Sequence, residues 1–346
     1  MRRQSLVLIG VSLEGAKMNG LQLSRMFFFE WGLPFLQRSF PQLIDQIVAG
    51  TFNGSHTLEA DDELSRDHAW GPRFALYLPT ESAAHWKIPL EQALNTAAPQ
   101  TFHSYQLALT WEKNVEVHAI DDFYQQEIGW SHPPEDIIDW VQSRVPSEEW
   151  VADSSRTRER EYRLYMLRHG HVFYDPHGEF SARQKAFWSY PEDIWLLRLW
   201  QETFAIWHYG QYNFLDRLVH RQDPLAIALC LGYFADAVMR LCLLLARDYS
   251  PYWKWLPFVF RQLPIAAELE TPFRLLFETS DRKEQSRRVQ EICHIVHCRL
   301  IEEQLVKKDA PNPTGHPHPL NVALPYILEH IKDKRILALF QYWRLD

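Results

Sequence analysis

The strongest structural signal in the chain is the run Ile47-Val48-Ala49-Gly50-Thr51-Phe52-Asn53-Gly54-Ser55. Its apolar part predicts a short strand, and Gly54-Ser55 predicts the turn that ends this strand. The glycine lets the backbone come close to a ligand, and backbone N–H groups together with the serine hydroxyl can bind anionic oxygens. The sequence therefore predicts a phosphate-binding turn at Gly54 and Ser55.

A second motif, Ser65-Arg66-Asp67-His68-Ala69, follows after an acidic segment. Two carboxylates two residues apart on a strand share a face, and carboxylate oxygens are the ligands that Mg²⁺ prefers. We expect residues 68–78 to form the partner strand, with Asp67 at its start. The second metal-binding position of such a pair holds Ala69, and a methyl group cannot bind a metal ion.

The order of these motifs resembles the bacterial domain-of-unknown-function 4037 family, DUF4037, which is nucleotidyltransferase-like. The resemblance spans most of residues 18–300 and is carried by the runs 18–25 (Met-Asn-Gly-Leu-Gln-Leu-Ser-Arg), 61–68 (Asp-Asp-Glu-Leu-Ser-Arg-Asp-His), 70–72, 167–175 and 249–255. The pattern expected in that family is Asp-His-Asp, where this chain has Asp67, His68 and Ala69. The acidic residues 61–63 are close in sequence to Ala69, where the second aspartate of the pattern is missing, and whether they point into the site is left open.

The resemblance implies an α+β chain, in which a small nucleotidyltransferase-like α/β domain with a mixed sheet precedes a mostly α-helical bundle. This is the arrangement of kanamycin nucleotidyltransferase. The implied chemistry is transfer of a nucleotidyl group from ATP or another nucleoside triphosphate, with Mg²⁺, to an unknown small-molecule or protein acceptor. Because Ala69 replaces one metal ligand, the alternative is a catalytically degenerate protein that binds nucleotide or a protein partner without turnover.

Four residues of the α/β domain are assigned roles under this resemblance. Asp67 is expected to bind the metal ion, while Gly54 and Ser55 hold phosphate. Glu116 lies on a predicted strand, residues 115–120, where it alternates with the apolar valines and shares a face with His118. We expect Glu116 to complete the site as a metal ligand or as the base, and an exposed strand residue is the alternative.

The helical bundle is expected to contribute nucleotide contacts as well. Lys254 can meet phosphate, and the ring of Tyr252 can stack on a base. The neighbouring Trp253 and Trp255 are equally suited to packing. A ribonuclease site of the Arg-x(4–6)-His type, at Arg288 and His294, is a third interpretation.

The expected domain boundaries follow the predicted elements. Residues 1–17 form an N-terminal extension, residues 18–133 the nucleotidyltransferase-like domain and residues 134–310 the helical bundle. Residues 311–346 form a proline-rich linker and a last helix. The domain of residues 18–133 is predicted to begin with a helix over 19–45 that packs on the sheet. A helix over 81–94 and a strand over 105–109 are predicted to follow, and residues 173–178 are predicted to form a turn.

Composition limits the function further. The 346 residues are 46% hydrophobic and 23% charged, with a net charge of −8, so a large basic surface for bulk nucleic acid is disfavoured. The longest apolar stretch, residues 225–246, contains Asp236 and Arg240 and predicts a buried helix rather than a membrane span. We expect a cytoplasmic protein.

The cysteines show no Cys-x-x-Cys pair. Cys293 and Cys298 alternate with His294 and His297, which permits a zinc interpretation, but zinc ligands usually occur at tighter, repeated spacings. Buried free thiols are the favoured prediction.

Overall fold

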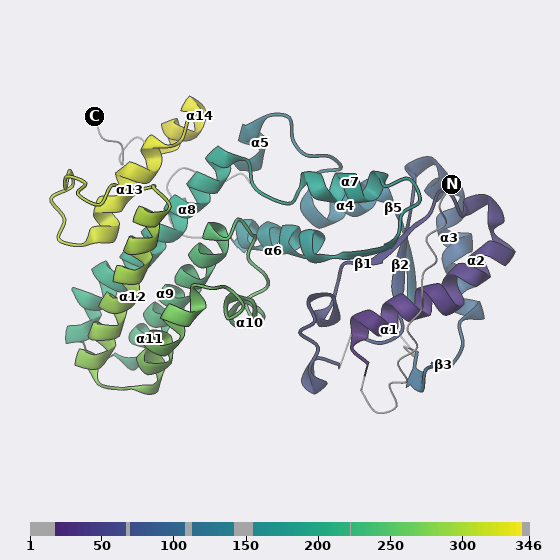
Figure 1. Ribbon diagram of the computed structural model, residues 1–346, viewed down its shortest axis with the longest axis horizontal. Coiled ribbons are helices and arrows are strands. Elements are labelled where there is room, and N and C mark those ends of the chain that lie inside the picture. The colour runs from purple at the N-terminus through teal and green to yellow at the C-terminus, as the bar shows by residue number, and fades with distance from the viewer. Residues whose placement is uncertain (1–17, 67–69, 108–112, 142–154, 222, 341–346) are drawn as a thin grey trace, which may run out of the picture. The chain divides into compact units, whose positions relative to one another are not determined.

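The computed structural model describes residues 18–66, 70–107, 113–141, 155–221 and 223–340 (Figure 1). The chain folds into two compact units. The α/β unit comprises the chain up to His118 together with His171–Pro176, and the helical unit comprises Ala119–Gly170 together with the chain from His177 onward. The predicted fold class, a small α/β part with a mixed sheet beside a mostly α-helical part, is confirmed.

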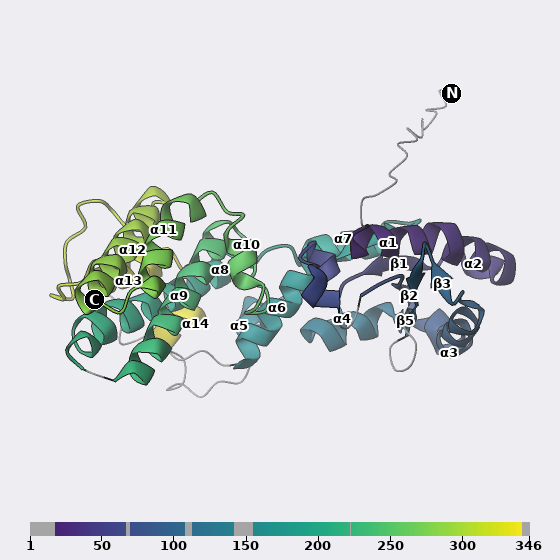
Figure 2. The same cartoon turned by 90° about the horizontal axis from the view of Figure 1, so that it is seen from below.

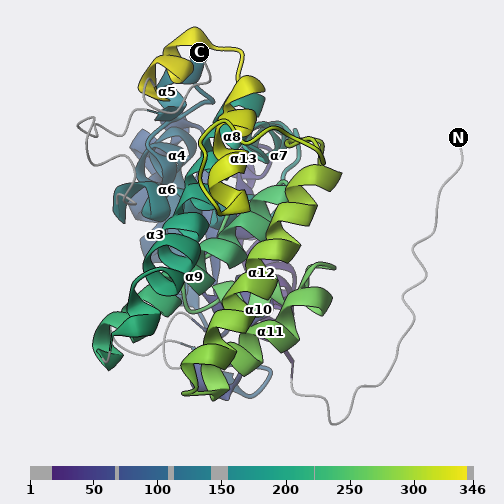
Figure 3. The same cartoon turned by 90° about the vertical axis from the view of Figure 1, so that its left-hand side faces the viewer.

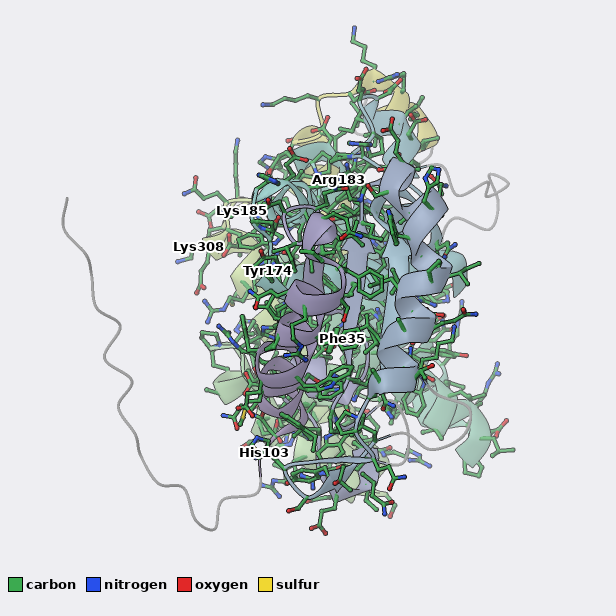
Figure 4. The ribbon with its side chains drawn as sticks, turned by 90° about the vertical axis from the view of Figure 1, so that its right-hand side faces the viewer. Phe35, His103, Tyr174, Arg183, Lys185 and Lys308 are labelled. Carbon is green, nitrogen blue, oxygen red and sulfur yellow. The ribbon has the colours of Figure 1, made fainter. Side chains whose placement is uncertain are left out.

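A four-stranded sheet forms the centre of the α/β unit, in the order β5-β2-β1-β6. Its strands are β1 (Val48–Thr51), β2 (Phe74–Leu78), β5 (Val115–Ala119) and β6 (His171–Tyr174). β1 pairs antiparallel with both β2 and β6 and is buried along its whole length. Tyr174, labelled in Figure 4, fixes the end of β6 because its hydroxyl donates to the carbonyl of Ile44 at 3.2 Å.

Helices cover both sides of this sheet. α1 (Gly20–Met26), the π-helical segment η1 (Phe27–Gly32) and α2 (Leu33–Ser39) run along one side, and α3 (Thr80–Ala97) lies on the other (Figure 2). Phe27 and Phe28 are fully buried, and their rings contact Phe74 of β2 at 5.4 and 5.3 Å. The predicted N-terminal helix is therefore present, as three consecutive helical segments followed by the 3₁₀ turn η2 (Pro41–Leu43).

The predicted partner strand over 68–78 is too long. β2 begins only at Phe74, and residues 70–73 are not part of a strand. Gly71 has φ +117 and Pro72 has no N–H to donate, so this segment cannot continue a ladder. Asp67, the residue expected at the start of this strand, lies outside the described residues.

Two further predictions of local structure, one of a turn and one of a strand, need correction. The predicted turn at residues 173–178 overlaps β6, because Phe173 and Tyr174 belong to the sheet. The strand predicted at 105–109 is shorter, at β4 (Tyr105–Gln106), and pairs with β3 (Thr101–Phe102) in a separate hairpin rather than joining the sheet. The predicted helix at 81–94 and the strand at 115–120 are confirmed by α3 and β5.

The helical unit is built from α4 (Ile120–Ile128), α5 (Ile137–Val141), α6 (Ser155–His169), α7 (Glu179–Ala186), α8 (Glu192–Ile206), η5 (Trp207–Leu215), η6 (Leu218–His220), α9 (Pro224–Leu245), α10 (Leu256–Phe260), α11 (Ala266–Glu278), α12 (Arg282–Glu302), α13 (Pro319–Glu329), α14 (Lys334–Leu337) and η7 (Ala338–Phe340). Figure 3 shows α8, α9, α11, α12 and α13 gathered in one bundle. Their buried side chains form one hydrophobic core.

Within the described residues, α9 alone is long and apolar enough to cross a membrane, and 67% of its apolar window is buried. Its first turn is capped by Asp223, whose carboxylate accepts from the N–H groups of Leu225 and Ala226. Twelve of its residues face the core of the bundle. The helix is therefore a core helix of the bundle, as its charged residues predicted.

Candidate functional site

The turn after β1 has the backbone conformation that a glycine permits. Gly54 has φ 85 and ψ 162, which is strained for any residue with a side chain. Ser55 opens the 3₁₀ turn η3 (Ser55–Leu58) and is 6% exposed. Its hydroxyl donates to the carbonyl of Ser65 at 3.3 Å, so it already ties this turn to the segment that precedes Asp67.

A layer of buried polar groups supports the turn from within the sheet. The Thr51 hydroxyl lies 3.2 Å from Nε2 of His56, and Thr57 donates to the carbonyl of Asn53 at 2.7 Å. His171 of β6 donates from Nε2 to the carbonyl of Thr57 at 3.1 Å. His56, Thr57 and His171 were not among the predicted site residues, because nothing in their sequence neighbourhood distinguishes a buried polar side chain from an exposed one.

Glu116 lies where the alternation of β5 predicted, on the face opposite the buried valines. Its Oε1 is 3.3 Å from Nη2 of Arg73, and its Oε2 accepts from Nε2 of His118 at 3.3 Å. The hydrogen bond from His118, helped by the charge of Arg73, holds the pKa of Glu116 below its usual value despite partial burial. The carboxylate therefore stays ionised and has a basic partner on each oxygen.

The basic partners of Glu116 come from β5 itself and from the residue just before its neighbour β2. Arg73 directly precedes β2, and His118 lies on β5 two residues after Glu116, where its ring stacks on Tyr77 at 5.6 Å between ring centroids. Arg73 was not among the predicted site residues. Its place beside Pro72 at the start of a strand is the only sequence signal it gives, and this signal does not reveal which strand lies next to it.

Asp67, His68 and Ala69 lie outside the described residues, so the metal-binding role of Asp67 stays a prediction. The nearby acidic residues are engaged in holding the backbone. Asp61 accepts from Nε1 of Trp70 at 2.7 Å and from the N–H of Gly20 at 2.8 Å, which fixes the start of α1. One oxygen of Asp62 accepts from the N–H of Ser65 at 2.9 Å.

The described residues alone do not complete a Mg²⁺ site, and the expected ligand Asp67 lies outside them. Mg²⁺ takes near-octahedral oxygen ligands from carboxylates, phosphates and water. Both oxygens of Glu116 have basic partners, and Asp61 holds a helix start and an indole. Among residues whose positions the structure gives, no three His, Cys, Asp or Glu side chains gather as a metal site would require.

The predicted nucleotide contacts of the helical unit belong to a group of aromatic rings. Tyr252 is 41% exposed and lies 5.7 Å from Tyr162 and 6.1 Å from Trp255, between ring centroids. The ammonium group of Lys254 lies 5.3 Å from the ring of Trp255. Tyr252 and Lys254 are thus accessible within their unit, in a setting that suits stacking and cation–π contact.

A buried network of charged side chains crosses the core of the helical unit and was not predicted. Glu161 of α6 is 1% exposed, and its Oε2 meets Nη2 of Arg198 at 2.9 Å and Nη1 of Arg240 at 3.8 Å. Arg198 also contacts Glu202 at 3.2 Å, and Arg240 contacts Asp236 at 2.9 Å. Burial opposes the charge of Arg198, but the carboxylates outweigh it and raise the pKa of this residue.

The residues of the ribonuclease and zinc interpretations lie on α12, and among the described residues they are not part of any group of three possible zinc ligands. Arg288 contacts Glu284 and Glu291, each at 2.7 Å, and is 12% exposed. Cys293 faces the core, whereas His294 is exposed and lies 3.6 Å from Sγ of Cys298. Three cysteines, Cys230, Cys242 and Cys293, are buried free thiols, as predicted, and Cys298 is half-buried.

Residues 157–256 match the family described as Domain of unknown function (DUF4037). The predicted resemblance is confirmed over this segment, which contains the quoted runs 167–175 and 249–255. The runs between residues 18 and 72 lie outside the matched segment. No curated protein matches the chain.

Among solved structures, the crystal structure of a nucleotidyltransferase-like protein from Exiguobacterium sibiricum 255-15 is similar to this chain. The two chains are 10% identical, over 89% of this chain and 91% of the other, with a TM-score of 0.34. A likeness of this degree does not by itself establish a shared fold or activity.

Proposed function

We propose that this chain is a nucleotidyltransferase-like protein that binds ATP or another nucleoside triphosphate at the Gly54-Ser55 turn without Mg²⁺-dependent transfer. The observation that carries the proposal is the set of contacts made by the Glu116 carboxylate. Both of its carboxylate oxygens have basic partners, Arg73 and His118, each at 3.3 Å. Ala69 removes a second carboxylate from the motif.

Nucleotide binding is supported by the turn itself. Gly54 has φ 85, which lets the chain turn sharply at the end of β1, and a bound phosphate would displace the Asn53 side chain, whose Oδ1 accepts from the Gly54 N–H at 2.8 Å. Arg73, which directly precedes β2, is a basic group of the same unit, and a guanidinium group can bind two phosphate oxygens at once.

The test measures ATP binding by calorimetry, with Mg²⁺ and with EDTA, and transfer from labelled ATP in a cell extract. We expect similar affinities in the two buffers and no transfer. Gly54→Ala is expected to weaken binding about tenfold or more, because a side chain at this φ forces the turn to rearrange. Gly178→Ala, at φ 71 in the helical unit, is the matched control and should leave binding unchanged.

Two results would overturn the proposal. Label transfer by the unmodified chain that stops in EDTA would establish the Mg²⁺-dependent transferase instead. Absence of ATP binding in both buffers, with guanosine and cytidine triphosphates also failing, would remove the nucleotide site altogether. Ala69→Asp sharpens the test, since restoring the second carboxylate is expected to make binding depend on Mg²⁺.

A further inference from the structure

Helix α9 exposes an apolar stripe on the side away from the bundle core. Leu225, Leu229 and Tyr233 are 76%, 61% and 47% exposed and follow one another at intervals of four residues, so they lie on one face. The smaller Ala228 and Gly232 lie between them and are also exposed.

This stripe differs from the other long surface helix of the unit. The exposed side of α12 carries ion pairs, such as Arg287 with Glu284 at 2.9 Å and Arg299 with Glu302 at 2.6 Å. In α9 no charged residue occurs between Pro224 and Ala235. A helix face in contact with water normally carries polar and charged side chains, so the stripe of α9 has the composition of a contact surface.

We propose that the stripe of α9 is the contact between two copies of this chain, related by a two-fold axis that makes the two α9 helices antiparallel. A two-fold contact requires the same surface to complement itself, so that each pair of facing residues occurs twice. The order of large and small residues in the stripe meets this requirement when the axis passes beside Cys230 and Leu231.

In that register the two large side chains nearest the axis each face a small one. Leu229 of one copy faces Gly232 of the other, and Tyr233 faces Ala228, and both pairs recur on the other side of the axis. A Cβ built on Gly232 would meet nothing within 4 Å in its own chain, so the space above this glycine is open for a leucine. Leu225 then lies opposite Asp236, whose carboxylate keeps its contact with Arg240 at 2.9 Å.

The size of the surface sets the strength of the contact. A stable dimer usually buries about 800 Å² on each partner. The stripe extends to Tyr209, whose ring stacks on Tyr233 at 5.1 Å, but two turns of one helix remain below that area. The dimer should therefore be weak and should dissociate on dilution.

Sedimentation velocity of the full chain over a wide concentration range tests the contact. We expect a monomer–dimer equilibrium that Leu229→Glu shifts entirely to monomer. Ile88→Glu, which changes a 66% exposed side chain on α3, is the matched control and should leave the dimer intact. Far-ultraviolet circular dichroism confirms that both variants are folded.

Crosslinking tests the register independently, in a Cys298→Ser background. Ala228→Cys in one chain and Tyr233→Cys in another should form a disulfide when the two variants are mixed, and neither should crosslink alone. A chain that stays monomeric at every concentration overturns the proposal, as does a dimer that Leu229→Glu leaves unchanged. Monomers that bind phosphatidylcholine vesicles through Leu229 would assign the stripe to a membrane surface instead.

Discussion

The two units hold their charged side chains in opposite ways. In the α/β unit, Glu116 and Arg73 meet at 3.3 Å, with side chains 42% and 17% exposed. In the helical unit, Glu161 and Arg198 meet at 2.9 Å, with side chains 0% and 9% exposed. The first pair is open to water, and the second is enclosed by the core.

This difference separates a pair that a ligand can replace from a pair that the fold depends on. A partly exposed ion pair contributes only about 0–1 kcal/mol, so a phosphate can take the place of the Glu116 carboxylate beside Arg73 at small cost. A buried pair has lost its water, and removing one partner leaves the other charge without compensation. We therefore expect Glu116 to govern ligand chemistry and Glu161 to govern the stability of the helical unit.

The largest effect is expected from Glu161→Ala. It leaves Arg198 and Arg240 buried without the carboxylate they share, and we expect a loss of about 3–5 kcal/mol in the free energy of unfolding of the helical unit. Urea denaturation followed by circular dichroism measures it. Glu192→Ala is the matched control, since Glu192 pairs with Arg247 at 2.6 Å while both are about half exposed, and it should cost at most about 1 kcal/mol. Equal losses in the two variants would contradict the comparison.

A second variant asks whether the buried charges themselves stabilise the fold. Replacing Glu161 by Leu and Arg198 by Met together removes the central pair and fills its volume. Because the two charges leave the core together, we expect the double variant to recover most of the stability that Glu161→Ala loses. A double variant less stable than Glu161→Ala would show that the pair with Arg198 is not what makes the single change costly, and would point to Arg240 instead.

A smaller effect is expected at Glu116, and it depends on pH. The pKa of Glu116 is lowered in the folded state by His118 and Arg73, so the stability it contributes is present above the unfolded pKa, about 4.3. That contribution is lost as the pH falls through the lower, folded pKa. Thermal unfolding in a series of acidic buffers measures this loss.

Glu116→Gln should remove this acid-dependent part and change the stability at neutral pH by less than about 1 kcal/mol. Glu81→Gln, on the first turn of α3, is a control for changing the net charge of the same unit. An unchanged acid profile in Glu116→Gln would show that the contacts with Arg73 and His118 do not form in solution.

The two regions also differ in how far the sequence predicted them. The Gly54 turn and the exposed position of Glu116 follow from local rules, namely a glycine at the end of a strand and alternation along a strand. The limits of β2 do not follow from such rules, because Gly71 and Pro72 interrupt residues 68–78, which the sequence predicts as one continuous strand. The pairing of Glu116 with Arg73 could not be predicted from local rules either, since it depends on which strands become neighbours in the sheet.

The buried network of charged side chains around Glu161 could not be predicted from the sequence, for a related reason. Glu161 belongs to a segment of alternating charge, residues 156–163, which is typical of a helix face in water. Its partners Arg198 and Arg240 come from α8 and α9, and only the packing of these helices against α6 turns one acid of a polar run into a core residue. Asp236 and Arg240 were noticed as charges in an apolar stretch, but their partners across the bundle could not be identified.

Alkylation of the cysteines in the unmodified chain tests whether burial decides which thiols of the helical unit react. Burial raises the pKa of Cys230 to about 11 and that of Cys242 to about 12, and it raises the pKa of Cys293 as well. Thiols held protonated are poor nucleophiles, so iodoacetamide should leave these three unmodified in the folded chain. Cys298 is half-buried beside His294 and should be alkylated first, as peptide mass spectrometry would show.

Because alkylation of an accessible thiol at the surface of α12 disturbs no core contact, it should leave the stability of the helical unit almost unchanged. Labelling of Cys293 at the rate of Cys298 would mean that the core around α12 opens readily, and the buried network would then be no more protected than the pair at Glu116.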